Sequence, residues 1–195
     1  KIYSNLEKDY NLFISHFKKN EDYEKNNIRL QISSNDFFKS NLFKNSIWHD
    51  FISYHSSKKF FLDIIDIFYD DIYKIYPDII NLIENNKNKE NFLGLREKKN
   101  NEKFFFVSDC QPGINTPVKI ESTVRNSHVD NPVELIAGLF YLRLPNDNSI
   151  GGDLEIMENN NKNEIKFYNK AEVYNNNDLK VFKKINYKKN NVIFF

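Results

Sequence analysis

One stretch in the first half of the chain shows a helical period of apolar residues. These residues recur four, three, four and three positions apart, and they are Phe61, Ile65, Phe68, Ile72 and Ile75. Charged residues fall on the opposite face, so the pattern predicts one amphipathic helix that carries this stripe and ends after Tyr76. Ser56 or Ser57 can cap its start. Pro77 ends it and begins a second helix that extends to Glu84.

The rest of the first half has weaker signals. Residues 28–32 alternate in polarity and predict a short strand. Ser34 is placed to cap a helix that extends to Lys44. The charged, Asn-rich stretch 85–101 predicts a loop or linker.

From Lys103 onward the period changes to that of strands. Turn signals separate the strand-like segments and lie at residues 112–113, 131–132, 145–148 and 151–152. The segments are 104–107, 117–124, 134–144, 153–157, 164–168 and 180–195. The pattern predicts an α+β chain: a mainly helical support region over 1–102, followed by an antiparallel β sandwich or barrel over 103–195, in one structural unit.

Composition and charge exclude several classes of protein. The 195 residues carry 28 Lys and Arg against 27 Asp and Glu, a formal net charge of +1, whereas a dedicated nucleic-acid binder is usually strongly basic. The single cysteine, Cys110, excludes an internal disulfide and any multi-cysteine metal site. Five aspartates interrupt the most apolar stretch, 60–83, so we expect no membrane partner and a cytoplasmic location.

The sharpest local feature is His128-Val129-Asp130. In an extended strand, residues two apart point to the same side, so the imidazole and the carboxylate should converge. A nitrogen and a hard oxygen ligand, completed by a second histidine, suit non-haem Fe(II) with open positions. Four of the five glycines and two of the four arginines, Arg125 and Arg143, also lie in the segment from Ser108 to Met157.

The context of this motif resembles a known family. The chain reads Asn115-Thr-Pro-Val118, then Ser122-Thr-Val-Arg-Asn-Ser-His-Val-Asp-Asn-Pro132, then Ala137-Gly-Leu-Phe-Tyr-Leu-Arg143 and Gly151-Gly-Asp-Leu-Glu-Ile156. This order of motif, apolar strand, Gly-Gly turn and strand is similar to that of the 2-oxoglutarate/Fe(II)-dependent oxygenases of the prolyl-4-hydroxylase-like branch. The resemblance covers about residues 108–195.

The resemblance implies a double-stranded β-helix, that is, a jelly-roll or cupin-like core with the N-terminal helices packed on it. It also implies that His128 and Asp130 are two of three ligands to Fe(2+), with 2-oxoglutarate as cosubstrate. The activity would then be a dioxygenase that uses O2 to hydroxylate a small-molecule or peptide substrate, with release of succinate and CO2.

The chain departs from the family at the third ligand. The family has a distal histidine followed by Arg or Lys, yet no histidine follows Asp130 here. The final residues, 189–195, resemble the strand that precedes that histidine. We therefore interpret the chain as a C-terminally truncated fragment that lacks the last strands of the core. The third ligand is expected beyond Phe195, and the 195-residue chain alone should bind iron poorly and turn over slowly or not at all. His16, His49 and His55 are interpreted as surface or packing residues.

The cosubstrate pocket has three candidates. Tyr141 lies on the strand after the motif, where family members often place a tyrosine that binds 2-oxoglutarate. Arg125 and Arg143 could each bind a carboxylate of cosubstrate or substrate, and the alternative is a structural ion pair. Two other functions stay open: a non-catalytic β-helix module that binds a carbohydrate or a protein, and a cupin-type metal enzyme that works without 2-oxoglutarate.

Overall fold

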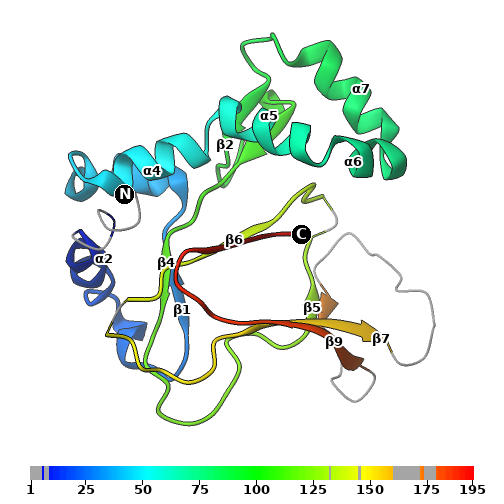
Figure 1. The fold of residues 1–195 in the computed structure, drawn as a ribbon. Coiled ribbons are helices and arrows are strands. Elements are labelled where there is room, and N and C mark those ends of the chain that lie inside the picture. Colours follow the sequence, from blue (N-terminus) through cyan, green and yellow to red (C-terminus); the bar gives the residue numbers. More distant parts are fainter. Residues whose placement is uncertain (1–5, 7–8, 132, 145, 160–171, 174–178) are drawn as a thin grey trace. The chain divides into compact units, whose positions relative to one another are not determined.

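A computed structural model describes residues 6, 9–131, 133–144, 146–159, 172–173 and 179–195. The chain divides into two compact units, Ser4–Lys119 and a second unit that contains Ile120–Phe195. Their secondary structure is labelled in Figure 1. The mixed α+β class predicted from the sequence is confirmed, with six α-helices and small two-stranded sheets among the described residues.

The helices of the described residues all lie in the first unit. They are α2 (Tyr10–Phe17), η1 (Glu21–Glu24), α3 (Ser34–Lys39), η2 (Asn41–Phe43), α4 (Ile47–His55), α5 (Lys58–Ile67), α6 (Tyr69–Ile75), α7 (Pro77–Asn86) and η3 (Asn101–Lys103). Two short sheets accompany them: β1 (Arg29–Gln31) pairs antiparallel with β4 (Gly113–Asn115), and β2 (Leu93–Leu95) pairs parallel with β3 (Phe106–Ser108).

The helix predicted over 61–75 forms in two pieces. Ser57 caps α5, since its side chain accepts a hydrogen bond from the Phe60 N–H. At Phe68 the backbone turns to φ −107° and ψ 17°, and α6 begins after it. The hydrogen-bond ladder passes through this residue, from the Phe68 N–H to Ile64 and from the Ile72 N–H to Phe68. The break is therefore a kink within a continuous apolar stripe.

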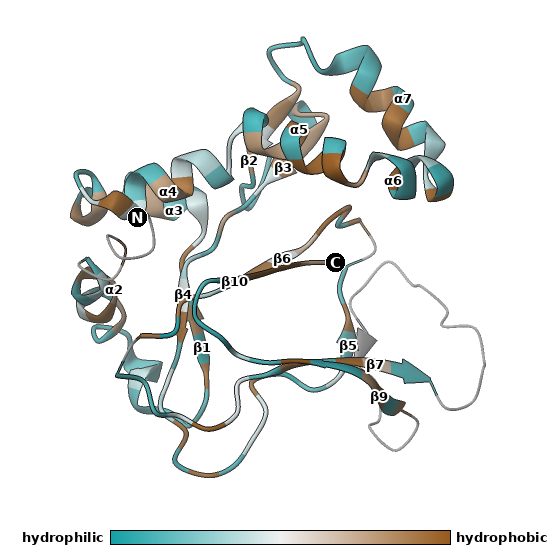
Figure 2. Cartoon of the chain, in the orientation of Figure 1, coloured by the Kyte–Doolittle hydropathy of each residue, from teal (hydrophilic) through white to brown (hydrophobic). Residues whose placement is uncertain are grey.

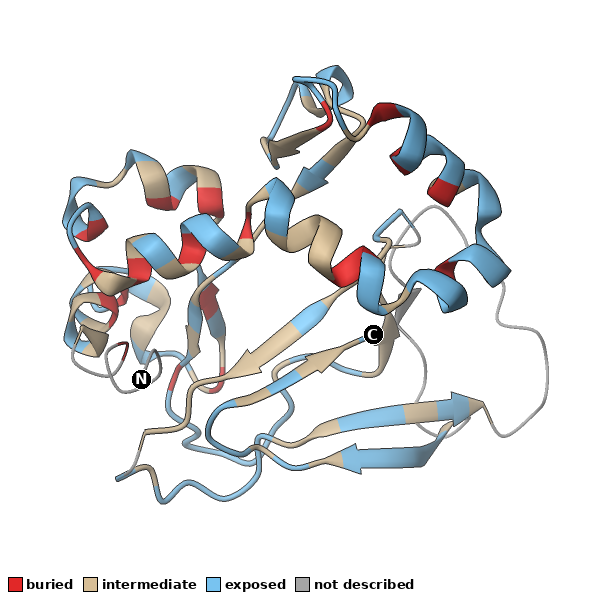
Figure 3. Ribbon diagram, turned by 45° about the horizontal axis from the view of Figure 1, so that its top comes forward, coloured by how far each residue is buried: buried red, intermediate tan, exposed pale blue. Residues whose placement is uncertain are grey.

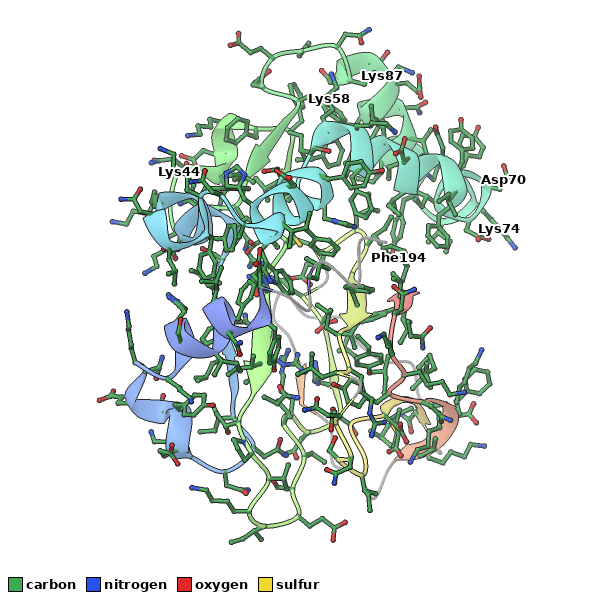
Figure 4. The ribbon with its side chains drawn as sticks, turned by 60° about the vertical axis from the view of Figure 1, so that its left-hand side comes forward. Lys44, Lys58, Asp70, Lys74, Lys87 and Phe194 are labelled. Atoms are coloured by element: carbon green, nitrogen blue, oxygen red, sulfur yellow. The ribbon has the colours of Figure 1, made fainter. Side chains whose placement is uncertain are left out.

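The polar face of this helix pair is exposed, as the pattern predicts. Asp70 and Lys74 on α6 and Lys87 after α7 are labelled in Figure 4, and the two α6 residues are exposed to solvent. On the apolar face Ile65 and Ile72 are buried, whereas Ile75, the last residue of the predicted stripe, is 64% exposed. Figure 2 shows the same alternation of hydrophobic and hydrophilic stretches along each helix.

An aromatic cluster forms the core of the first unit. Phe37 and Phe43 stack with ring centroids 4.5 Å apart, and Trp48 lies edge-on to Phe13 at 4.1 Å. All four rings are almost fully buried. Burial of this size supplies the hydrophobic free energy that the short helices need to be stable. Figure 3 shows the buried positions along these helices.

The second unit consists of paired strands. β5 (His128–Val129) pairs with β8 (Glu172–Val173), β6 (Gly138–Tyr141) with β10 (Asn191–Phe194), and β7 (Leu154–Asn159) with β9 (Leu179–Ile185), all antiparallel. The β7/β9 pair is enclosed in sequence by the β6/β10 pair, so the chain forms one long antiparallel ribbon with an interruption between its two halves (Figure 1). None of the described side chains of 120–195 is fully buried.

Three local predictions were wrong. The stretch predicted as a loop, 85–101, contains the end of α7 and strand β2. Residues 117–124 form no strand, and β4 forms instead at 113–115, where a turn was expected. The helix from Ser34 ends at Lys39, and η2 follows. In β4 and β2 the partner strand decides the conformation, because pairing with distant segments outweighs local preference.

Other predicted boundaries fall near the observed ones. The predicted strand 28–32 contains β1, and the helix from Pro77 extends to Asn86. The strand expected at 164–168 lies outside the described residues. Sequence analysis placed the boundary of the helical region at 102, and the compact units divide after Lys119, since β3 and β4 pair with strands of the first unit. Among the helices of the described part, none is both long and apolar enough to cross a membrane.

Candidate metal site

His128 and Asp130 converge, as their spacing predicts. His128 lies opposite Val173 in the β5/β8 pair, and Asp130 follows directly after β5. The Nε2 atom of His128 is 3.3 Å from Oδ1 of Asp130. Their side chains are 23% and 36% exposed, so both groups are reachable from solvent. The pair therefore forms a partly shielded site with one nitrogen and one oxygen donor.

The main chain just before β5 fixes the imidazole ring. Nδ1 of His128 lies 2.7 Å from the carbonyl oxygen of Asn126. A carbonyl oxygen only accepts, so Nδ1 carries the proton and the neutral ring has its lone pair on Nε2. That lone pair and the Asp130 carboxylate oxygen then face each other. Two acceptors at 3.3 Å need a cation or a proton between them.

A transition-metal ion fits this spacing. An ion about 2.1 Å from each of two ligands at a right angle keeps the ligands about 3 Å apart. A backbone carbonyl that accepts a hydrogen bond from the other ring nitrogen is also a usual partner of a metal-binding histidine. Over the described residues, no cluster of three or more His, Cys, Asp or Glu side chains is placed to bind a metal. The pair thus presents one nitrogen and one oxygen donor that could bind a metal ion.

Arg125 belongs to the same cluster. Its Nη1 atom lies 3.9 Å from Oδ1 of Asp130, the oxygen that also faces His128. This distance is too long for a hydrogen bond, and the Arg125 side chain is 52% exposed. Nearby, the Thr123 hydroxyl donates to the side-chain oxygen of Asn126 at 3.3 Å. The segment from Thr123 to Asp130 therefore presents a cation, an imidazole and a carboxylate together.

Tyr141 and Arg143 meet around a different residue, Tyr187. The ring of Tyr141 lies edge-on to that of Tyr187 with centroids 5.0 Å apart. The Arg143 guanidinium lies 5.1 Å from the centroid of the same ring and donates to the Tyr187 carbonyl oxygen at 3.1 Å. It also donates to the carbonyl oxygens of Asp147 and Ser149, at 3.3 Å and 2.6 Å. Arg143 thus joins the loop after β6 to the segment between β9 and β10.

Two carboxylates lie in the same region, which is called the Arg143 corner because Arg143 joins the two halves of the ribbon there. Hydrogen bonds from Ser149 lower the pKa of Asp147, whose carboxylate also lies 3.7 Å from the Arg143 Nε. The Tyr187 N–H donates to Asp153 at 2.7 Å and lowers the pKa of that carboxyl. Gly151 and Gly152 between them have φ values of 92° and 78°, as expected for this turn. Arg143 therefore makes an ion pair with Asp147 and hydrogen bonds to the main chain on both sides of this region.

The histidines and the cysteine of the first unit have packing environments. His16 and His49 contact the rings of Phe43 and Phe38, at 5.6 Å and 5.3 Å. His55 lies 3.9 Å from the Phe51 ring, and burial lowers its pKa. Burial, with the nearby charge of Asp109, raises the pKa of the Cys110 thiol to about 12. A thiol with so high a pKa is a poor nucleophile.

Two contributors to these clusters were not found from the sequence. Asn126 acts through its backbone carbonyl, and no residue-type pattern marks a carbonyl. Tyr187 lies in a lysine-rich stretch, 44 residues after the arginine that it contacts. Aromatic residues within a basic stretch, here Phe182 and Tyr187, are a signal that could have drawn attention to it.

Comparison with known proteins adds no relative: no protein-family model, no curated protein sequence and no solved structure matches this chain. Functional inference therefore rests on the residues and the geometry described above.

Proposed function

We propose that the chain is the core of an Fe(II)- and 2-oxoglutarate-dependent dioxygenase that hydroxylates a small-molecule or peptide substrate. One observation carries the proposal: Nε2 of His128 and Oδ1 of Asp130 lie 3.3 Å apart while the Asn126 carbonyl binds the opposite ring nitrogen. This spacing fits two neighbouring ligands of one metal ion. The order of motifs after His128 supports the same assignment.

The strand pairing supports a jelly-roll core. In a jelly roll a long antiparallel ribbon folds so that its two halves enter different sheets. The β6/β10 pair and the β7/β9 pair are two halves of such a ribbon, and the Arg143 corner lies between them. The described side chains of this unit are at most partly buried.

Each residue of the site has a distinct task in this proposal. His128 and Asp130 bind the iron, and the Asn126 carbonyl holds the imidazole in the tautomer that binds metal. A third ligand, a histidine, is expected after Phe195 in the reading frame. Once bound, iron supplies the activation of O2 that couples decarboxylation of 2-oxoglutarate to hydroxylation. The protein's own part is to orient the ligands and to limit water around them.

Metal binding tests the proposal without a known substrate. Mn²⁺, a redox-stable substitute for Fe²⁺, is titrated into the protein that the full reading frame encodes, and binding is followed by the electron paramagnetic resonance signal of the ion. Replacing His128 by Ala should weaken binding at least ~10-fold, since even the loss of a supporting residue costs about that much. His49→Ala is the matched control, because His49 packs on Phe38 in the first unit. Equal binding by all three proteins would refute the assignment.

Turnover is the second test. The reading frame is sequenced past the codon for Phe195, and the protein that it encodes is assayed for succinate formed from 2-oxoglutarate under O2. A downstream histidine followed by Arg or Lys, with succinate formation lost in His128→Ala, is the expected result. Succinate formation that persists in His128→Ala would contradict the proposal.

A non-catalytic binding module is the second candidate. The observation in its favour is that the described residues supply two ligands and no third. If His128 is protonated, its Nε2–H can donate to Asp130, and Arg125 adds a second cation to the same carboxylate. The three side chains would then form an ion-pair cluster that needs no metal. This alternative predicts no Mn²⁺ signal that depends on His128.

A further inference from the structure

The two arginines near the motif differ in their surroundings. Arg143 is 28% exposed, and three main-chain carbonyl groups and the Tyr187 ring surround its guanidinium. Arg125 is 52% exposed, and its contact with Asp130 is a 3.9 Å ion pair without a hydrogen bond. A guanidinium has five N–H donors. The N–H donors of Arg143 largely bind carbonyl groups of the protein itself, whereas the N–H donors of Arg125 face a site that a ligand can reach.

We propose that Arg125 binds a carboxylate group at this site and that Arg143 does not. The inference rests on the proposed function, because it takes the His128–Asp130 pair as the place where the ligand sits. A carboxylate matches the planar fork of a guanidinium and can accept two parallel hydrogen bonds from it. The carboxylate comes either from 2-oxoglutarate or from the substrate.

The position of Arg125 suits this task. Its Nη1 and the His128 Nε2 approach the same oxygen of Asp130, so a ligand bound at the metal pair would lie next to the guanidinium. When a metal ion binds Asp130, it neutralises part of the negative charge of the carboxylate. The attraction between Asp130 and Arg125 then weakens. An anionic ligand then restores the charge balance of the cluster. Binding of metal and carboxylate should therefore be mutually favourable.

The presence of Arg rather than Lys at position 125 agrees with this role. Lys is the common cation of this chain, and only four of its 28 basic residues are Arg. Arg143 has a geometric need for a guanidinium, because one group must reach three carbonyl oxygens. At an exposed position with a single long ion pair, Lys would satisfy Asp130 equally well. A bidentate ligand is what would require the planar fork at position 125.

The test uses isothermal titration calorimetry on the Mn²⁺-loaded protein that the full reading frame encodes. In the first arm 2-oxoglutarate is titrated into wild type, Arg125→Gln and Arg125→Lys. In the second arm glutarate is titrated with 2-oxoglutarate already saturating, so it reports on a separate substrate carboxylate. Arg96→Gln, an exposed arginine of the first unit, is the control. Loss of a bidentate charged contact should weaken binding about 10- to 100-fold, with Lys restoring little.

A loss confined to the first arm assigns Arg125 to the cosubstrate, and a loss confined to the second assigns it to the substrate. Wild-type affinity of Arg125→Gln in both arms, or an equal loss in Arg96→Gln, would overturn the inference and leave the metal site standing. If that protein binds no Mn²⁺, the proposed function fails. The titrations are then repeated on the metal-free protein, where unchanged binding in Arg125→Gln overturns the inference as well.

Discussion

Replacing Arg143 by Lys should destabilise the antiparallel ribbon at the region that joins its two halves, so that its strands separate more easily. The guanidinium donates to the carbonyl oxygens of Asp147, Ser149 and Tyr187, and one ammonium group cannot reach all three. Two such bonds are lost, each worth about 1.5–3 kcal/mol when the donor is charged. Partial exposure and new water contacts offset part of this. The contact with the Tyr187 ring adds about 0.5–1 kcal/mol, and the ion pair adds little. The expected net loss is about 2–3 kcal/mol.

Hydrogen exchange measures this loss locally. Amides of β9 and β10 should exchange about 30- to 150-fold faster in Arg143→Lys, because opening of the ribbon becomes easier by that factor. Arg125→Lys is the matched control, since the half-exposed Arg125 makes one long ion pair. Its exchange rates should stay within a factor of about 5 of wild type. If the two variants behave alike, the carbonyl contacts of Arg143 do not stabilise the corner and the reasoning is wrong.

Three further predictions concern single residues. Gly151→Ala should cost about 1 kcal/mol of unfolding free energy because of its positive φ, and Gly152→Ala should cost more, because its Cβ would also lie 3.2 Å from the Tyr187 ring; urea unfolding with equal midpoints for the two variants would contradict this. Burial keeps His55 neutral in the folded chain and lowers its pKa. The unfolded chain takes up a proton as the pH falls through about 6.5, so stability should fall below that pH, and less so in His55→Phe, as measured by urea midpoints at about pH 7.5 and about 5.5. The raised pKa of Cys110 makes stability depend on pH in the opposite direction: the free energy of unfolding should decrease as the pH rises from 9.0 towards about 12. A thiol reagent at about pH 8 should label the native chain slowly and the urea-unfolded chain fast. Fast labelling of the native chain would show that the thiol is not protected.

Local patterns predicted the features that depend on neighbours in sequence. The apolar stripe of 61–75 predicted the α5 and α6 pair, and the cap at Ser57 followed from residue type. The convergence of His128 and Asp130 followed from the two-residue period of a strand, because both atoms belong to one short segment. The residues in these interactions lie close together in the sequence, so the backbone period nearly fixes their geometry.

Features that depend on distant partners could not be predicted in this way. Strand β4 forms because residues 113–115 pair with 29–31, and the local Pro-Gly signal pointed to a turn. The role of Arg143 depends on Tyr187, which the sequence places 44 residues later. The tautomer of His128 depends on the direction of the Asn126 carbonyl, which no residue-type pattern encodes. In each case tertiary structure supplied the deciding contact.

The most direct test of the central claim is whether one metal ion binds between His128 and Asp130. Mn²⁺ titration of the protein that the full reading frame encodes, as wild type, His128→Ala and Asp130→Asn, followed by electron paramagnetic resonance, decides it. The account predicts one bound ion in wild type and binding at least ~10-fold weaker in both variants, with His49→Ala unchanged. Wild-type binding retained by His128→Ala and Asp130→Asn, or no binding by wild type, would contradict the claim.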